Sequence, residues 1–450
     1  MDILFINIQL RPGNPRKQLP VGLAYIMTAV KKAGFEFDLI DMDIDDLSMK
    51  QLKNRINKKI YDVYCMGCVV TGYSKVKQIA NIIRDVNPYA KIVIGNSVAS
   101  SIPDILFSTT SVDYIVMGEG DVTIVSLLKS LDKKSGNRVD QVKGIALPDF
   151  VSIKRNIIED LDRVGFPDWD LFDLKKYAKY SKVNVNDSSG KDIISFPLNS
   201  ARGCPNNCGF CYHVFKGEKY RRYSIDAVIG EMRRLRERYG CNYISFWDEL
   251  TFPNKTSLRM FLNELIRKRI DIRWEATIRA GVFDMSDVDL LKSAKDLGCD
   301  NMSFSLESGS PEILRAMNKR MKVGDFIKQA EVFNTADIKI FTSVIFGYPQ
   351  ETLSTIEQTI NVCEKVNIFP SSGFLLPMPG TSVYDQARRM GKISDEVEYL
   401  GRIGDRQDLH INLTAMSDDE LVNNVELELS SLASKLGIKG DVFKTISGKK

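Results

Sequence analysis

The sequence lacks the segments that direct a chain into or across a membrane. None of its 450 residues lie in an apolar run long enough to span a bilayer. The opening residues, MDILFINIQL, have neither the basic start nor the cleavage site of a secretory signal. We therefore predict a cytoplasmic protein with reduced thiols, and we expect no disulfide among its eight cysteines.

An excess of charge of one sign is also lacking. The net charge is only +4, with 62 Lys and Arg against 58 Asp and Glu, and the two signs are interspersed. Without a long basic tract, nucleic acid is not an expected partner. The most basic segment, KGEKYRRYS at residues 216–224, is interpreted as a solvated loop, with binding of a phosphorylated substrate as the alternative.

Three cysteines stand close together in the segment ARGCPNNCGFCYH. Cys204, Cys208 and Cys211 have the spacing C-x3-C-x2-C. Thiolates bind soft metals and iron-sulfur clusters, and three on one loop can hold three irons of a cubane while its fourth iron has no protein ligand. A structural zinc site would need a fourth ligand, such as His213 or a distant cysteine.

The other five cysteines are expected to be small buried hydrophobic residues. Cys65 and Cys68 form a C-x2-C pair, which would be a redox or metal pair only if both faced one way near a helix start. Cys241, Cys299 and Cys363 stand singly. The sequence therefore predicts no second iron-sulfur centre.

The cysteine loop resembles that of the radical S-adenosylmethionine (SAM) enzymes, and Tyr212, directly after the last cysteine, also fits the family pattern. The resemblance implies a [4Fe-4S] cluster on Cys204, Cys208 and Cys211, with SAM chelated by the free iron. It further implies cleavage of SAM to a 5′-deoxyadenosyl radical under anaerobic conditions. An external electron donor such as flavodoxin or ferredoxin would supply the electron.

Downstream, short apolar runs alternate with amphipathic stretches, which indicates strand-helix units of a parallel barrel. We expect six units, a partial (β/α)6 TIM barrel. The expected strands are residues 193–199, 243–247, 272–277, 301–306, 340–346 and 373–376, and the clearest helices are 225–239, 286–297, 323–335 and 353–365. Chemistry in such a barrel gathers at the carboxyl ends of the strands.

Polar residues follow several of these strands. Asp248 and Glu249 end the second unit, where relatives contact the SAM amino group; as an alternative, this pair could cap the next helix. Arg279 could pair with the SAM carboxylate or form a surface ion pair. Ser305 and Glu307, in FSLESGS, resemble the ribose-binding motif of the family.

Residues 1–147 have a different pattern, with apolar runs at 2–9, 37–43, 63–70, 91–97 and 114–118 separated by helical segments. This predicts an α/β doubly wound (Rossmann-like) sheet, whose ligands bind beyond the carboxyl ends of the strands. The segments LPVGLAYIMTAVKKAGFEFDLIDMD, GCVVTGYSKVKQIANIIRDVNPYAKIVIGN and VDYIVMGEGDVTIVSLLKSL resemble a cobalamin-binding domain. The resemblance assigns cofactor contacts to Gly67, Thr71, Gly72, Gly95, Ser97, Gly118, Glu119 and Gly120.

Two features depart from the cobalamin pattern. The sequence has no D-x-H-x-x-G motif, and its only histidines, His213 and His410, lie outside residues 1–147. Any cobalamin is therefore expected to be base-off and histidine-off. The segment GNSVAS stands where relatives often carry a G-G-x-H-type loop, which could tune the cofactor or indicate a degenerate site.

The predicted domains are a cobalamin-binding-like domain (1–147), a linker (148–192), the radical SAM barrel (193–392) and a small helical C-terminal region (393–450) that is expected to close the barrel mouth. The resemblance implies a cobalamin-dependent radical SAM C-methyltransferase that acts on a small molecule. The alternatives are a cyclase or rearrangement enzyme, a methylthiotransferase and a non-catalytic cofactor-binding protein. The sequence identifies no catalytic acid or base, and His410 is not assigned that role.

Overall fold

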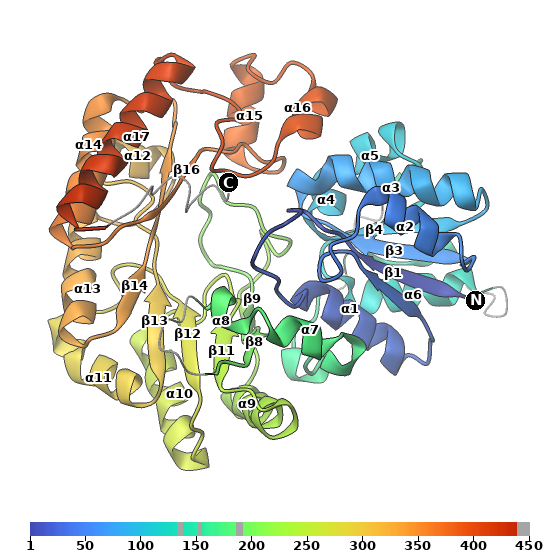
Figure 1. Ribbon diagram of the computed structural model, residues 1–450, viewed down its shortest axis with the longest axis horizontal. Helices are drawn as coiled ribbons and strands as arrows, with labels where there is room; N and C mark the ends of the chain where they lie inside the picture. The colour runs from blue at the N-terminus through green and yellow to red at the C-terminus, as the bar shows by residue number, and fades with distance from the viewer. Residues whose placement is uncertain (133–137, 152–154, 156, 186–191, 439–450) are drawn as a thin grey trace. The chain divides into compact units, whose positions relative to one another are not determined.

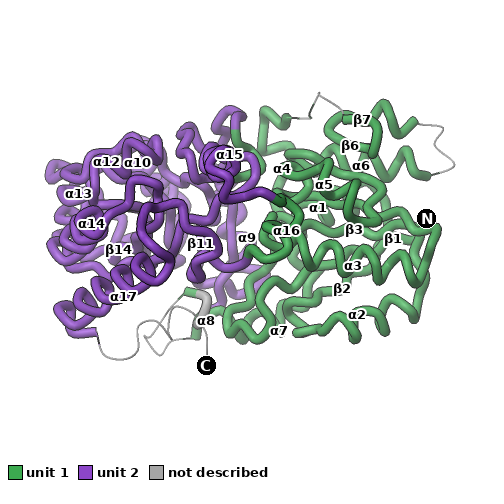
Figure 2. Tube along the Cα trace, turned by 90° about the horizontal axis from the view of Figure 1, so that it is seen from above, with its two compact units in different colours: residues 1–193, 212–216, 395–403 green, residues 194–211, 217–394, 404–450 purple. Residues whose placement is uncertain are grey.

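The computed structural model describes residues 1–132, 138–151, 155, 157–185 and 192–438. The chain divides into two compact units, which are distinguished by colour in Figure 2. Unit 1 comprises Met1–Ile193, Tyr212–Lys216 and Asp395–Ile403. Unit 2 comprises Ile194–Cys211, Gly217–Ser394 and Gly404–Lys450. The expected linker, residues 148–192, thus belongs to unit 1.

Unit 1 is built on one sheet with strand order β2-β1-β3-β4-β5-β6-β7 among the described residues. The first five strands are parallel, and β6 and β7 add to them in antiparallel pairing, with β7 at the edge. The strands are β1 (Ile3–Asn7), β2 (Asp38–Asp41), β3 (Val63–Gly67), β4 (Lys91–Gly95), β5 (Tyr114–Val116), β6 (Ile145–Leu147) and β7 (Phe150–Val151). Central strands such as β1 and β3 are almost wholly buried, as apolar runs covered on both faces must be.

Helices cover both faces of this sheet (Figure 1). Helix α1 packs beside α6 on one face, and α2 packs beside α3 on the other. The helices are α1 (Val21–Lys32), α2 (Met49–Ile56), α3 (Tyr73–Val86), α4 (Asn96–Ser101), α5 (Pro103–Thr109), α6 (Gly120–Leu131), α7 (Leu174–Ala178), α8 (Ser181–Asn184) and α16 (Glu396–Arg402). The predicted doubly wound fold is confirmed, and its strand order reverses between β1 and β3.

Unit 2 contains the barrel strands. Five parallel strands have the order β14-β13-β12-β11-β8, and β15 and β16 form a separate parallel pair. The strands are β8 (Ser195–Leu198), β9 (Ala201–Arg202), β10 (Arg221–Arg222), β11 (Tyr243–Phe246), β12 (Arg273–Thr277), β13 (Cys299–Ser303), β14 (Lys339–Phe341), β15 (Ser343–Phe346) and β16 (Ser371–Phe374). The partial barrel is therefore present, and an isolated bridge between Glu307 and Val344 links β15 to the segment that follows β13.

One expected strand is interrupted. Residues 340–346 were predicted as a single strand, but β14 ends at Phe341 and β15 begins at Ser343. Thr342 lies between them because its polar atoms serve other segments. Its hydroxyl accepts a hydrogen bond from the Leu306 amide at 3.0 Å, and its carbonyl accepts one from the Ser371 amide at 2.9 Å.

The helices of unit 2 begin at strong local signals. Ser224 caps α9, which ends at the left-handed Gly240, and Asn254 and Thr352 form capping boxes at α10 and α14. The helices are α9 (Ile225–Tyr239), α10 (Lys255–Lys268), α11 (Val288–Asp296), α12 (Pro311–Ala316), α13 (Val323–Thr335), α14 (Leu353–Lys365), α15 (Ser382–Arg389) and α17 (Asp418–Lys435).

The C-terminal region is helical, as expected, but it serves both units. Helix α16 packs against α3 in unit 1, whereas α17 packs against α14 in unit 2. The ring of His410 bonds to the Asp405 carbonyl of its own loop at 2.9 Å. The expected role of the C-terminal region in closing the barrel mouth stays a prediction. Among the described residues, no helix combines the length and apolar character needed to cross a membrane.

Candidate functional site

The loop that carries the three cysteines is held in place by main-chain contacts from distant parts of unit 2. The Gly209 amide donates to the carbonyl of Met317, just after α12, at 2.8 Å. The Gly209 carbonyl accepts from the Ser382 hydroxyl at 3.1 Å and from the Val383 amide at 3.3 Å, both in the first turn of α15. The chain around Cys208 is therefore fixed before any metal is considered.

The three thiols of this loop are neither fully buried nor fully exposed, unlike the other five, which are all buried; all eight are free cysteines. Burial raises the pKa of Cys208, while the positive charges of Lys319 and Arg279 act in the opposite direction. The Asn206 side chain donates to the Cys204 sulfur at 3.4 Å. Accessible thiols near cations suit an iron-sulfur cluster, whose ligands must be thiolates.

The described residues contain no group of three or more His, Cys, Asp and Glu side chains placed to hold one metal ion. A cubane does not require such a group, because each of its thiolates binds a different iron. The expectation of a polynuclear cluster therefore rests on the spacing of the three cysteines.

The acidic pair after β11 supports the cysteine loop. Asp248 is buried, and its carboxylate accepts hydrogen bonds from the Ser200 amide (2.8 Å), the Ser200 hydroxyl (2.6 Å) and the Ala201 amide (3.0 Å). Glu249 accepts one from the Gly203 amide at 3.2 Å. Burial raises the pKa of Asp248 to about 7 and also raises that of Glu249. The alternative in which this pair caps the next helix is wrong, because Asn254 caps α10.

Glu307 lies in a second polar cluster, after β13. Its backbone is left-handed (φ 61°), and its buried carboxylate pairs with the ammonium of Lys319 at 2.9 Å. Lys319 also donates to the Ser305 carbonyl at 2.8 Å, while the Ser343 hydroxyl bonds to that of Ser305 at 2.9 Å. The structure therefore brings Ser305 and Glu307 together.

Lys319 was not found from the sequence, where it is one of several basic residues in NKRMK. The signal that could have found Lys319 was charge balance, because a buried carboxylate such as that of Glu307 needs a cation nearby. The Arg279 guanidinium, also considered as a surface ion-pair partner, donates instead to the backbone carbonyl of Arg320 at 3.1 Å.

A cavity of about 400 Å³ opens among the barrel strands of unit 2. Two of its aromatic lining residues, Trp247 and Phe341, are 38% and 42% exposed. The cavity is lined by Phe246, Trp247, Asp248, Glu275, Ala276, Thr277, Asn301, Ser303 and Phe341, none of which is basic. Its volume lies in the range of small-molecule sites.

In unit 1, the candidate residues lie at the carboxyl edge of the sheet. Gly67 and Gly95 end the neighbouring strands β3 and β4 in register. A Cβ atom on Gly95 would meet nothing within 4 Å, whereas one on Gly72 would lie 2.0 Å from the Cys68 sulfur. The open space at Gly95 lets a ligand approach its backbone closely. At Gly72 a glycine is required, because any side chain would collide with Cys68.

Hydrogen bonds fix the remaining loops of this edge. The hydroxyl of Ser97 accepts from the Val70 amide at 3.1 Å, next to Thr71, and the hydroxyl of Ser100 accepts from the Gly118 amide at 3.0 Å. Glu119 precedes Gly120, the first residue of α6, and accepts from the Ile158 amide at 2.9 Å.

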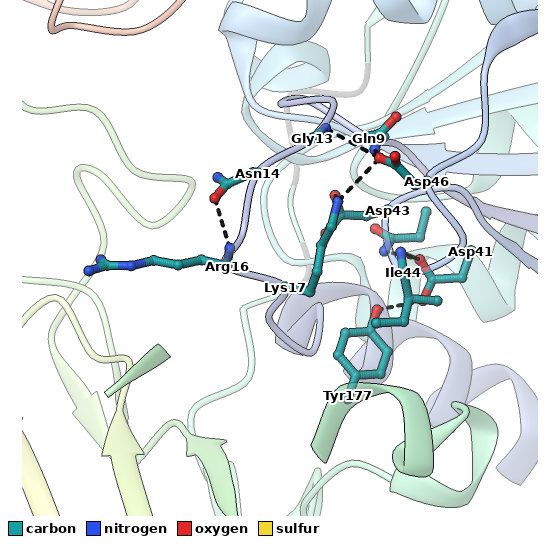
Figure 3. Close-up of polar contacts among 11 residues, drawn as sticks. Gln9, Gly13, Asn14, Arg16, Lys17, Asp41, Asp43, Ile44, Asp46 and Tyr177 are labelled. Carbon is teal, nitrogen blue, oxygen red and sulfur yellow. Dashed lines mark hydrogen bonds and ion pairs between the residues drawn. The ribbon is translucent and has the colours of Figure 1, made fainter. Parts of the chain in front are cut away.

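A polar network connects the segment that follows β1 with the segment that follows β2 (Figure 3). The buried ammonium of Lys17 pairs with Asp43 at 3.1 Å and with Asp46 at 3.6 Å. The Tyr177 hydroxyl donates to Asp41 at 2.5 Å. The segment after β1 is therefore pinned to the segment after β2, as an edge that receives a ligand requires.

Tyr212, which the sequence predicts beside SAM, belongs to unit 1, and burial raises its pKa. His213 follows in the same unit, and burial lowers its pKa. The predicted role of Tyr212 in SAM binding stays a prediction.

Comparison with known proteins supports both halves of the chain. Residues 198–363 match the radical SAM superfamily, and residues 17–128 match the B12 binding domain. An uncharacterized methyltransferase of Pyrococcus horikoshii is 26% identical over 82% of this chain and 78% of the relative. The anaerobic magnesium-protoporphyrin IX monomethyl ester cyclase of Cereibacter sphaeroides is 25% identical over 89% of this chain, which spans 66% of that relative.

Among solved structures, the radical SAM methyltransferase TsrM from Kitasatospora setae, with cobalamin and a [4Fe-4S] cluster bound, has a similar fold. The TM-score is 0.71 at 16% identity, covering 99% of this chain and 97% of that one. The two family matches confirm the expected cofactors, a [4Fe-4S] cluster, SAM and cobalamin. The chain therefore carries a B12-binding domain ahead of a radical SAM domain.

Proposed function

We propose that this protein is a cobalamin-dependent radical SAM methyltransferase that methylates an unactivated carbon of a small molecule. The observation that carries the proposal is that one chain contains both a three-cysteine loop, held in place by main-chain hydrogen bonds, and a B12-binding domain. When bound, the cluster and SAM would supply a 5′-deoxyadenosyl radical, and cobalamin would supply methyl-group transfer. An external donor such as flavodoxin or ferredoxin would provide the electron.

The residues of unit 2 would have distinct roles in this reaction. Cys204, Cys208 and Cys211 would hold the cluster. Asp248 would hold the chain that leads into the cysteine loop, because three donors of that chain point at its carboxylate. Ser305 and Glu307 would bind the SAM ribose.

Arg279 would pair with the SAM carboxylate. Its guanidinium donates to a backbone carbonyl and forms no ion pair with a carboxylate of the described residues. Glu249, which holds the Gly203 amide, would contact the SAM amino group together with Asp248.

The cavity of about 400 Å³ supports a small molecule as substrate. Its two titratable lining residues, Asp248 and Glu275, are both acidic. Its substrate would therefore present hydrogen-bond donors or positive charge toward Glu275, and its apolar part would pack against Trp247 and Phe341.

In unit 1, the backbone at Gly67, Gly95, Gly118 and Gly120 and the side chains of Thr71, Ser97 and Glu119 would contact cobalamin, with Gly72 needed for packing. The carboxyl edge of a doubly wound sheet is where such folds bind ligands. No histidine stands in residues 1–147, so base-off, histidine-off binding is proposed.

The first test is anaerobic reconstitution of the full chain, followed by quantification of iron, sulfide and cobalamin. The proposal expects four irons and four sulfides per chain, and cobalamin after growth with ample supply. Cys208→Ala should lose the iron, whereas the matched control Cys299→Ala, which changes a buried cysteine, should keep it. Iron without cobalamin would reject the methyltransferase assignment and leave the radical chemistry in place.

The second test separates methyl transfer from cyclisation, which the similarity to the cyclase makes the second candidate. Reduced enzyme is incubated with SAM and cobalamin, and both 5′-deoxyadenosine and S-adenosylhomocysteine are measured. A methyltransferase should release S-adenosylhomocysteine as the methyl group leaves SAM. Formation of 5′-deoxyadenosine alone, above the Cys208→Ala control, would favour the cyclase class, and formation of neither would favour a binding protein.

A further inference from the structure

Tyr348 is a buried tyrosine whose hydroxyl has no hydrogen-bond partner among the described residues. It follows β15 in the segment GYPQET and is 1% exposed. Buried hydroxyl groups nearly always find a partner, because leaving one unpaired is destabilising. This hydroxyl therefore calls for an explanation.

Hydrogen bonds hold the backbone of this turn in place, so the fold fixes the position from which the Tyr348 side chain extends. The Glu351 amide donates to the Tyr348 carbonyl at 2.8 Å, and the Gly347 amide donates to the Glu351 carboxylate at 3.1 Å. Gly347 has a φ of 101°, which an L-residue rarely adopts. An anchored turn of this kind presents the ring in one direction.

The surroundings of the hydroxyl belong to the candidate site. Tyr348 follows β15, whose Ile345 amide donates to the Glu307 carbonyl at 2.9 Å and whose Val344 forms a bridge with Glu307. Burial, together with the negative charges of Glu307 and Cys208, raises the pKa of Tyr348. The hydroxyl therefore keeps its proton and can act as a donor. Glu307 does not accept that proton, because its carboxylate is already paired with Lys319.

We propose that the Tyr348 hydroxyl donates a hydrogen bond to an anionic acceptor that arrives with the cofactors, either a sulfur of the cluster or the carboxylate of SAM. The inference rests on the proposed function, in which Cys208 is a cluster ligand. Tyr348 would be a positioning residue. The acceptor is anionic because the cluster sulfurs and the SAM carboxylate are the negatively charged groups that the cofactors would bring to the loop of Cys208.

The two acceptors predict different effects of Tyr348→Phe. A hydrogen bond to a cluster sulfur stabilises the reduced, more negative cluster, so its loss should lower the reduction potential. A hydrogen bond to the SAM carboxylate should leave the potential of the SAM-free cluster unchanged and weaken SAM binding about tenfold.

The experiment uses full-length protein reconstituted anaerobically. Iron and sulfide are quantified first, because a wild-type chain without a cluster would reject the proposed function rather than this inference. The cluster is then titrated with dithionite, which adds one electron and no proton, and followed by electron paramagnetic resonance without SAM. SAM affinity is measured separately by equilibrium dialysis.

Tyr243→Phe is the matched control. Tyr243 is also buried in unit 2, but its hydroxyl contacts Glu275 and Asp300, each at 3.2 Å. The control should destabilise the metal-free protein and leave potential and SAM affinity unchanged. Tyr348→Phe should show the reverse pattern, with no loss of metal-free stability. An unchanged potential together with unchanged SAM affinity would overturn the inference, as would a metal-free destabilisation equal to that of the control.

Discussion

The buried ion pair between Lys319 and Glu307 gives the sharpest prediction about stability. Each side chain is 8% exposed, and the ammonium lies 2.9 Å from the carboxylate. Lys319→Met would leave Glu307 buried with the Ser343 hydroxyl, at 3.4 Å, as its one side-chain hydrogen-bond donor among the described residues. Breaking a buried pair from one side typically costs about 3–5 kcal/mol, so we expect a loss of that size in the free energy of unfolding.

The assay is urea unfolding of metal-free protein followed by tryptophan fluorescence. Of the three tryptophans, Trp169 lies in unit 1, whereas Trp247 and Trp274 lie in unit 2. A Trp169→Phe background therefore makes the signal specific to unit 2, where the ion pair is located. Separating the units matters because a chain with two units need not unfold in one step.

Two controls make the result interpretable. Lys435→Met removes a surface pair with Glu364, whose side chains are 51% and 38% exposed, and should cost at most about 1 kcal/mol. The double variant Lys319→Met/Glu307→Leu should recover much of the loss, because no charge stays buried alone. A loss below about 1 kcal/mol for Lys319→Met, or a double variant as unstable as the sum of both single variants, would refute the reasoning.

Three further predictions concern other parts of the chain. Burial raises the pKa of Asp248 from 3.8 to about 7, so between these pH values the folded state holds a proton that the unfolded state has released. The stability of the protein relative to Asp248→Asn should therefore fall between about pH 4 and 7 and level off above, and urea midpoints independent of pH would contradict this. Tyr177→Phe removes a 2.5 Å hydrogen bond to Asp41 and should destabilise unit 1 by about 1.5–3 kcal/mol in urea unfolding, whereas an unchanged midpoint would show that the bond contributes nothing. Gly309→Ala would place a Cβ atom 2.4 Å from the Gln358 carbonyl oxygen, so thermal unfolding should show a loss of about 1–3 kcal/mol, and an unaltered melting temperature would mean that α14 yields without cost.

Much of the fold follows from local pattern. Apolar runs such as residues 63–70 contain the buried strand β3, and the periodic segment 225–239 coincides with α9. The break at Thr342 was not predictable in this way, because every residue of 340–346 except Ser343 is apolar or β-branched. Its cause is hydrogen bonding to Leu306 and Ser371, which are distant in sequence.

The candidate site was predicted where residue type and spacing carry the chemistry, and it was missed where contact depends on folding. The spacing of Cys204, Cys208 and Cys211 is readable directly, and the family matches confirm the domain in which they stand. Lys319 and Tyr348 have no such spacing. Their roles depend on the packing of α12 and β15 around Glu307, which only the folded chain reveals.

The contacts of Gly209 also bear on how the protein acquires iron during its production. Ser382, which holds the carbonyl of Gly209, is added to the chain 173 residues after it. Until the ribosome has passed Val383, the loop has its contact with Met317 but lacks its two partners in α15. We therefore expect iron delivery to follow translation of the whole barrel, so that nascent chains stalled before α15 recruit no metal from the cellular assembly machinery.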